Sequence, residues 1–189
     1  MVKKHNNWFP GAIFHVSCFG PWCRRIFYEE PDYVAYLSVL ERVRYQYPFY
    51  LHSYCLIANR ILLLLETTHV PIKEVITTLN LEYSLYFQRK YSCFPEFQFH
   101  TSLIDSVENF LNASKITHLA PLQDNLPLNN YGWSSYLAFI SSVPNDHVVT
   151  SQILYYFRHP KSNHYYLFVE GEENRGKYLW ENSQKEAFP

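Results

Sequence analysis

Segments with the apolar spacing of strands and of helices follow one another along the first 120 residues. Strand-like segments lie at 12–18, 49–57, 60–66 and 97–104: the segment at 60–66 is a short run of leucines, and the other three are rich in aromatic and β-branched residues. Segments at 31–47, 71–91 and 107–118 instead repeat apolar positions at helical spacing. The resulting order, β-α-β-β-α-β-α, predicts an α+β fold. We expect a ferredoxin-like βαββαβ antiparallel sheet with helices on one face, plus one added helix. Ligands, including nucleic acid, would bind the open face.

Turn and capping residues mark the ends of these elements. Ala58 and Asn59 form a short link that predicts a hairpin between the second and third strands, and Asp105 or Ser106 is expected to cap the last helix. Asp32 lies off the apolar stripe of the first helix, as does Glu41. Beyond Pro121, the sequence predicts a loop, a short element from Trp133, two short helices at 149–157 and 162–170, and a polar tail. We therefore divide the chain into a domain of residues 1–140 and a C-terminal helical extension and polar tail of residues 141–189.

Composition narrows the possible functions. The 189 residues are 48% hydrophobic and 19% aromatic, so one domain can build its own core, in which we expect most of the rings. The formal net charge is −1, with 16 basic and 17 acidic residues, so the excess of cations typical of a dedicated nucleic-acid binder is absent. DNA binding would need a local basic patch.

Cysteines and apolar runs predict an intracellular protein without a structural metal. The four cysteines contain no Cys-x-x-Cys pair, no secretory signal is visible, and the longest apolar run, residues 61–65, is too short to cross a bilayer. We expect a cytoplasmic protein with reduced thiols, no cofactor and no membrane association.

Several phrases resemble one known family. WFPGAIFHV at 8–16, LHSYCLI at 51–57, LLLE at 63–66, NLEYSLYF at 80–87 and WSSY at 133–136 are similar, in the same order, to the REP-associated tyrosine transposases. This family belongs to the HUH single-tyrosine class. The resemblance implies that residues 1–140 form an IS200-like (HUH-type) transposase domain.

The resemblance also implies a reaction and the residues that would perform it. In the family, a tyrosine attacks a DNA phosphodiester, and two histidines one residue apart on a strand hold a divalent cation together with a third ligand from the tyrosine's helix. Here the histidine positions are Arg60 and Leu62, the tyrosine position is Ile116, and the third-ligand position is Ala120. Arginine stays protonated and the other three side chains carry no polar atom, so no catalytic or metal-binding residue is expected.

Other residues could still meet DNA. A guanidinium at Arg60 could hold the phosphate that the metal would otherwise hold. We also expect cations and stacking rings in the N-terminal arm, after the first strand and on the last helix, at Lys3, Lys4, Arg24, Arg25, Lys115, Trp8 and Trp22. The histidines that match family positions, His15, His52 and His118, form either a residual polar cluster or separate structural sites.

Three functions follow from these observations. The first is a catalytically inactive transposase-like protein that binds hairpin or single-stranded DNA without cleavage. The second is a protein-interaction module on the same scaffold, which the near-zero net charge favours. The third is an active nuclease with a rearranged site and a replacement nucleophile such as Tyr54, Tyr83 or Tyr86. A homodimer is compatible with each of them.

Overall fold

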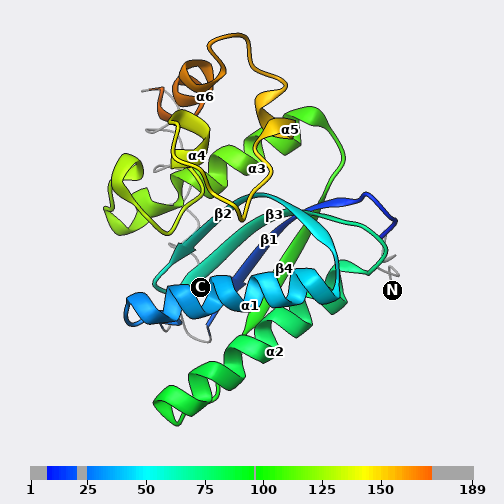
Figure 1. Ribbon diagram of the computed structural model, residues 1–189, viewed down its shortest axis with the longest axis vertical. Helices are drawn as coiled ribbons and strands as arrows, with labels where there is room; N and C mark the ends of the chain where they lie inside the picture. Colours follow the sequence, from blue (N-terminus) through cyan, green and yellow to red (C-terminus); the bar gives the residue numbers. More distant parts are fainter. Residues whose placement is uncertain (1–7, 21–24, 96, 172–189) are drawn as a thin grey trace, which may run out of the picture.

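The computed structural model describes residues 8–20, 25–95 and 97–171 (Figure 1). All seven predicted elements are confirmed in the predicted order. They are β1 (Ile13–Phe19), α1 (Glu30–Gln46), β2 (Phe49–Ile57), β3 (Arg60–Thr67), α2 (Ile72–Tyr91), β4 (Gln98–Ile104) and α3 (Val107–Leu119). Ser106 rather than Asp105 caps α3, because its side chain accepts a hydrogen bond from the Asn109 backbone N–H at 3.2 Å.

The four strands form one antiparallel sheet in the order β2-β3-β1-β4. β2 and β3 form the hairpin predicted from the link at residues 58–59. The register of this hairpin shifts between Leu51 and Ser53, so His52 lies at a bulge. Beyond this bulge the regular pairing resumes, and successive residues of β2 from Ser53 onward point to opposite faces of the sheet.

α1 and α2 cover one face of the sheet, which we call the α1/α2 face (Figure 1). Alternate residues of the strands point toward these helices, as the period of two requires. They share one large buried core with the apolar sides of α1 and α2, which includes Phe14, Val16, Ile61, Leu63, Leu65, Leu40, Leu79 and Tyr83. The ferredoxin-like arrangement is thus confirmed for this face.

Asp32 lies inside the structure, although it falls off the apolar stripe of its helix. Its carboxylate accepts hydrogen bonds from the Tyr28 and Glu29 backbone N–H groups, from the Tyr86 and Tyr91 hydroxyls, and from the Lys90 ammonium. The burial of Asp32 opposes ionisation, but these donors outweigh it and lower the pKa of the carboxyl. The side chain ties the start of α1 to the end of α2, an interaction that a local pattern could not reveal.

The opposite face, which we call the α3 face, is only partly open. α3 packs over β2 and β3, and the C-terminal helices gather around it in the upper half of Figure 1. The elements after α3 are η2 (Ala120–Asp124), η3 (Leu128–Asn130), α4 (Leu137–Ile140), α5 (Ser151–Leu154) and α6 (Lys161–Glu170). They form a second core with Leu64, Phe110, Phe139, Ile153 and Tyr165. The expected open face is therefore restricted to β1 and β4, because consecutive leucines in β3 require burial on both sides of the sheet.

Backbone hydrogen bonds close the β2 edge of the sheet. The Leu56 N–H donates to Trp133 at 2.9 Å, the Ser135 N–H to Tyr54 at 3.0 Å, and the Val149 N–H to Leu51 at 2.8 Å. The predicted helix at 149–157 is shorter than expected, since only residues 151–154 are helical. The domain boundary after residue 140 stays a prediction. Within the described ranges, no helix combines the length and apolar character that a membrane crossing requires.

Candidate functional site

The exposed part of the α3 face is a strip of side chains from β1 and β4, which we call the open strip. The strand register places His15, Ser17 and Phe19 of β1 directly opposite Ser102, His100 and Gln98 of β4 on this face. The β1 side chains are half-buried and those of β4 are exposed. Seven residues of strand give the strip a length of roughly 20 Å, at about 3.3 Å per residue.

Leu62 and Ala120, which the sequence resemblance aligns with two metal ligands, pack in one buried apolar cluster with Cys55 and Ile57. Leu62 is 4% exposed and faces the end of α3, where Ala120 follows the helix. Neither side chain offers a ligand atom, and burial raises the pKa of the neighbouring Cys55 thiol to about 12. These residues do not fit a divalent cation. No group of three or more His, Cys, Asp or Glu side chains that could hold a metal occurs among the residues that the structure describes.

Arg60 begins β3 and brings a positive charge to the edge of this cluster. It lies opposite Phe19 of β1 and Ile57 of β2, at one end of the open strip. Its side chain is half-buried, and its Nε is buried without a hydrogen-bond partner in the described part of the chain. A buried N–H donor that lacks an acceptor is costly, so an anion that reaches this group would gain a hydrogen bond.

His15 of β1, on the same face of the sheet, is under the electrostatic influence of this cation but stays neutral at neutral pH. Burial, together with the charges of Arg60 and His100, lowers the pKa of His15 to about 4. Its Nε2 lies 3.2 Å from the Thr117 hydroxyl of α3. His15 thus supplies a hydrogen-bonding group rather than a charge.

The three histidines at family positions do not form one cluster. His52 Nε2 lies 3.1 Å from Glu66, whereas His118 is fully buried between the Tyr165 hydroxyl at 2.7 Å and the Ser135 hydroxyl at 2.8 Å. Burial lowers the pKa of His118 to about 3. Each histidine has its own structural partner, which agrees with the second of the two predicted roles.

Ile116, which the sequence resemblance aligns with the nucleophile, is 41% exposed on α3. The tyrosines considered as replacements have their hydroxyls in hydrogen bonds elsewhere. Tyr83 donates to the Ile26 carbonyl at 2.7 Å, Tyr86 donates to Asp32, and Tyr54 accepts from the Asn145 side chain at 3.1 Å. Tyr54 and Tyr83 belong to the core beneath the α1/α2 face, away from Arg60.

The other residues predicted to bind DNA lie in different places. Trp8 packs against the core beneath the α1/α2 face and donates its indole N–H to Thr67 at 2.9 Å, so this ring has a structural role. Lys115 lies over the Phe168 ring, with its Nζ 4.5 Å from the centroid. Arg25 is exposed and lines a cavity beside the β2–β3 turn. The predictions for Lys3, Lys4, Trp22 and Arg24 fall outside the described residues.

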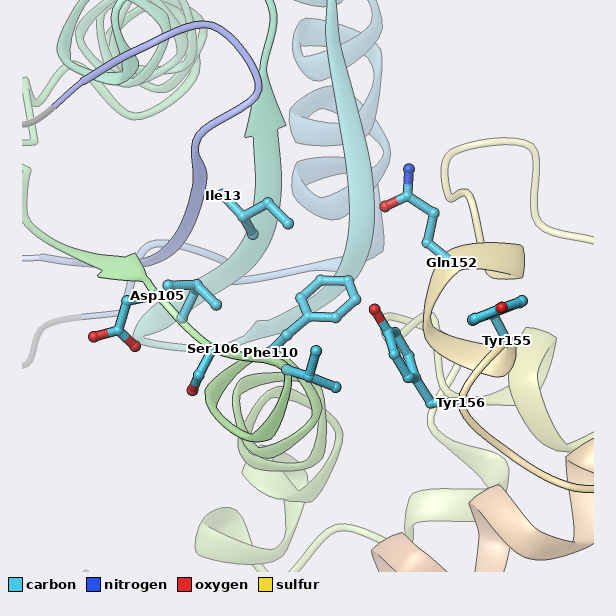
Figure 2. Close-up of a pocket in the computed structure, with 9 residues that line it drawn as sticks. Ile13, Asp105, Ser106, Phe110, Gln152, Tyr155 and Tyr156 are labelled. Atoms are coloured by element: carbon cyan, nitrogen blue, oxygen red, sulfur yellow. The ribbon is translucent and has the colours of Figure 1, made fainter.

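A hollow at the other end of the open strip was not foreseen from the sequence. Figure 2 shows Phe110 between Ile13 of β1 and Tyr156, beside α5. The hollow has a volume of about 420 Å³, and its rim includes Asp105 and Gln152. Tyr155 and Tyr156 are 75% and 47% exposed. The two consecutive tyrosines are visible in the sequence, but only the fold shows that they are exposed and that they line this hollow.

No protein-family model matches the sequence, and no curated protein matches it. Among solved structures, a REP-associated tyrosine transposase bound to a REP hairpin is similar to this chain. The TM-score is 0.63 at 6% identity, and the alignment covers 79% of this chain and 98% of the transposase chain. A protein from Deinococcus radiodurans R1 described as a candidate transposase has a TM-score of 0.44 at 13% identity, covering 65% and 94% of the two chains. The first similarity shows that this chain has the fold of a REP-associated tyrosine transposase.

Proposed function

We propose that this chain is a catalytically inactive relative of the single-tyrosine transposases that binds hairpin or single-stranded DNA without cutting it. The observation that carries the proposal is the packing at the site that the resemblance assigns to the metal. Leu62 and Ala120 fill it with buried apolar atoms, while Arg60 adds a fixed positive charge at its edge. The fold is retained, but the groups that would activate a phosphodiester are replaced.

Arg60 would bind a DNA phosphate at the end of the open strip. A guanidinium offers five donors in a planar fork that matches phosphate oxygens, and its Nε here has no other partner among the described residues. Hydroxyls of Ser17 and Ser102 line the rest of the strip and suit contacts to the backbone or to bases. Because the chain has a net charge of −1, we expect few phosphate contacts and modest affinity.

Binding can be tested by fluorescence anisotropy with labelled hairpin DNA at low salt. The solved transposase with this fold was bound to a REP hairpin, which supports a hairpin as the first probe. Arg60→Gln should weaken binding by tenfold or more, as expected for a charge-assisted hydrogen bond of about 1.5–3 kcal/mol. It should also reduce the dependence of affinity on salt by about one phosphate contact.

Arg42→Gln is the matched control. Arg42 lies on α1 and pairs with Glu82 of α2 at 2.9 Å, so this variant loses the same charge on the other side of the sheet. Equal affinities of the Arg60 and Arg42 variants would exclude Arg60 as the phosphate site. Wild-type binding no tighter than that of an unrelated acidic protein would exclude DNA binding on this surface.

Absence of cleavage needs its own measurement. We expect no covalent protein–DNA adduct and no nicked product after incubation of a hairpin with the protein and Mg²⁺ or Mn²⁺. The reason is that neither Ile116 nor the replaced ligand positions can supply a nucleophile or hold the cation. An adduct detected on a denaturing gel would overturn this part of the proposal and favour the rearranged nuclease.

The tyrosine hollow favours a second function, a protein-interaction module. Asp105 lines the hollow, and Glu108 lies in the first turn of α3, so phosphate groups would be repelled there. Exposed tyrosines beside apolar side chains are typical of protein-binding hot spots. In a pull-down after nuclease treatment, a specific partner should be recovered by the wild type and lost by the Tyr155→Ser, Tyr156→Ser variant. If that variant loses hairpin binding instead, the hollow belongs to the DNA site.

A further inference from the structure

The hollow between β1 and α5 combines an apolar floor with a rim of exposed aromatic rings. Its floor is built from strand-end and helix side chains, namely Ile13, Ile104, Val107 and Phe110. Phe110 is only 5% exposed and packs edge-on against His52, with the ring centroids 5.1 Å apart, so it offers apolar surface but almost no free ring face. At about 420 Å³ the hollow lies within the range of ligand pockets and has room for one long side chain.

Tyr155 and Tyr156 supply the ring surface that the floor lacks. They remain 75% and 47% exposed although they line the hollow. Their ring centroids lie 5.5 Å apart at an interplanar angle of 85°, so the two rings form a corner. Figure 2 shows Tyr156 facing Phe110, with Tyr155 farther out. The face of an aromatic ring carries partial negative charge, and rings that meet at an angle can contact an organic cation from two sides.

The charges around the hollow are negative. Asp105 lines it, and Glu108 lies in the first turn of α3. Glu66 lies directly opposite Ile13 in the β1–β3 ladder, and therefore on the same face of the sheet. Its partner His52 does not cancel this charge, because burial lowers the pKa of His52 and keeps the imidazole neutral at pH 7. Among the residues that the structure describes, no lysine or arginine lines the hollow.

The N-terminus of α3 opposes a cation, because its backbone N–H groups carry about half a positive charge in total. The side chains there outweigh it. Ser106 accepts a hydrogen bond from the Asn109 N–H at 3.2 Å, and Asp105 accepts one from the Asn109 side-chain amide at 2.6 Å. Figure 2 shows the Asp105 carboxylate pointing away from Phe110, so it acts on a ligand through its charge rather than from the floor. With Glu108 in the same turn, this rim repels anions.

We propose that the hollow binds an alkylammonium group, which a lysine side chain of a protein partner supplies. The four-carbon stem lies on the apolar floor, and the ammonium group lies in the corner of the two tyrosine rings. Gln152 lines the same hollow, and its amide oxygen can accept a hydrogen bond from the ammonium group. The inference rests on the second proposed function, the protein-interaction module, to which it adds the chemistry of the partner.

Three small probes test the charge of the ligand. Heteronuclear NMR titrations use n-butylammonium, butan-1-ol and butyrate, which are similar in length and differ in charge. We expect n-butylammonium to bind about tenfold more tightly than butan-1-ol, and butyrate to bind most weakly, with shifts in the backbone signals of residues 105–110 and 152–156. Equal binding of the amine and the alcohol, tighter binding of butyrate, no saturable shift with any probe, or shifts confined to other residues would each overturn the proposal.

Variants of Tyr156 test the role of the ring. Tyr156→Leu keeps apolar bulk but has no ring face, so it should bind n-butylammonium about tenfold more weakly and butan-1-ol as before. Tyr156→Phe keeps the ring and should keep the preference for the amine. Tyr45→Leu, which replaces a tyrosine that is 93% exposed near the end of α1, is the matched control and should behave as the wild type. Full preference for the amine in Tyr156→Leu would overturn the assignment.

Lysine capped at both ends, as the Nα-acetyl N-methylamide, separates a protein partner from a free amine. It should bind at least as tightly as n-butylammonium, and its exclusion would overturn the lysine source. The pull-down with the Tyr155→Ser, Tyr156→Ser variant separates this inference from the interaction module. A partner that only the wild type recovers, without any preference for the amine, would refute the lysine chemistry and leave the module standing. Binding of the amine without such a partner would refute the module and, with it, the lysine source.

Discussion

Introducing a histidine at residue 62 should destabilise the protein rather than create a metal site. We consider Leu62→His, alone and together with Arg60→His, which rebuilds the His-x-His spacing of the resembling family. Two histidines on one strand face lie at a suitable spacing for a cation. However, Ala120 supplies no third ligand, and the space around residue 62 is filled by Cys55 and Ile57.

The burial of Leu62 determines how much unfolding free energy the Leu62→His variant should lose. Leu62 is 4% exposed, so its replacement removes buried apolar contacts worth about 2 kcal/mol, the lower end of leucine truncation in a core. An imidazole nitrogen left without a partner in this cluster costs a further 1–3 kcal/mol or so. A total of about 3–5 kcal/mol should lower Tm by roughly 10 °C in a chain of this size.

Thermal and urea unfolding followed by circular dichroism, with and without Mn²⁺, check this expectation. Leu62→Met is the control, since it conserves volume and adds no ligand nitrogen, and it should cost no more than about 1.5 kcal/mol. A double-histidine variant as stable as the wild type, with a Tm that rises on addition of Mn²⁺, would refute the reasoning. In that case the fold would still provide a usable metal site at residues 60 and 62.

Three further predictions concern stability. Burial depresses the pKa values of His15 and His118 to about 4 and about 3, below the usual 6.5, so the unfolded chain takes up protons first as pH falls. Stability should therefore be constant above about pH 7 and fall by a few kcal/mol between pH 6.5 and 4, and a flat urea midpoint over that range would contradict this. Asp32→Asn should cost about 3 kcal/mol or more, because an amide presents donors to the Lys90 ammonium and two hydroxyls; a Tm within 2 °C of the wild type would argue against the network. Ser106→Ala should cost about 1 kcal/mol through loss of the α3 cap, whereas Ser38→Ala, within α1, should cost less in the same melt, because the exposed Ser38 hydroxyl only donates to the Val34 carbonyl of its own helix.

Local periodicity carried most of the fold. The short apolar run at residues 61–65 and the helical spacing in residues 71–91 depend on neighbours in the chain, so the elements and their ends could be predicted. The resemblance to the transposase family aligns Arg60, Leu62, Ile116 and Ala120 with the metal ligands and the nucleophile of that family, because similar residues on either side of each position set the register. The sequence alone therefore predicted the transposase fold, while the replacement of its site stays a prediction.

Tertiary structure decided what surrounds these four residues. Asp32 is buried because donors from α2, more than fifty residues away, converge on it, and no local pattern encodes that contact. The C-terminal helices restrict the open face to β1 and β4, and the pairing of those strands creates the open strip. Tyr156 comes to line one hollow with Ile13 of β1, and Asn59 one cavity with Gln123, only after the chain has folded. A site built from distant segments depends on long-range packing, which the period of a single segment does not specify.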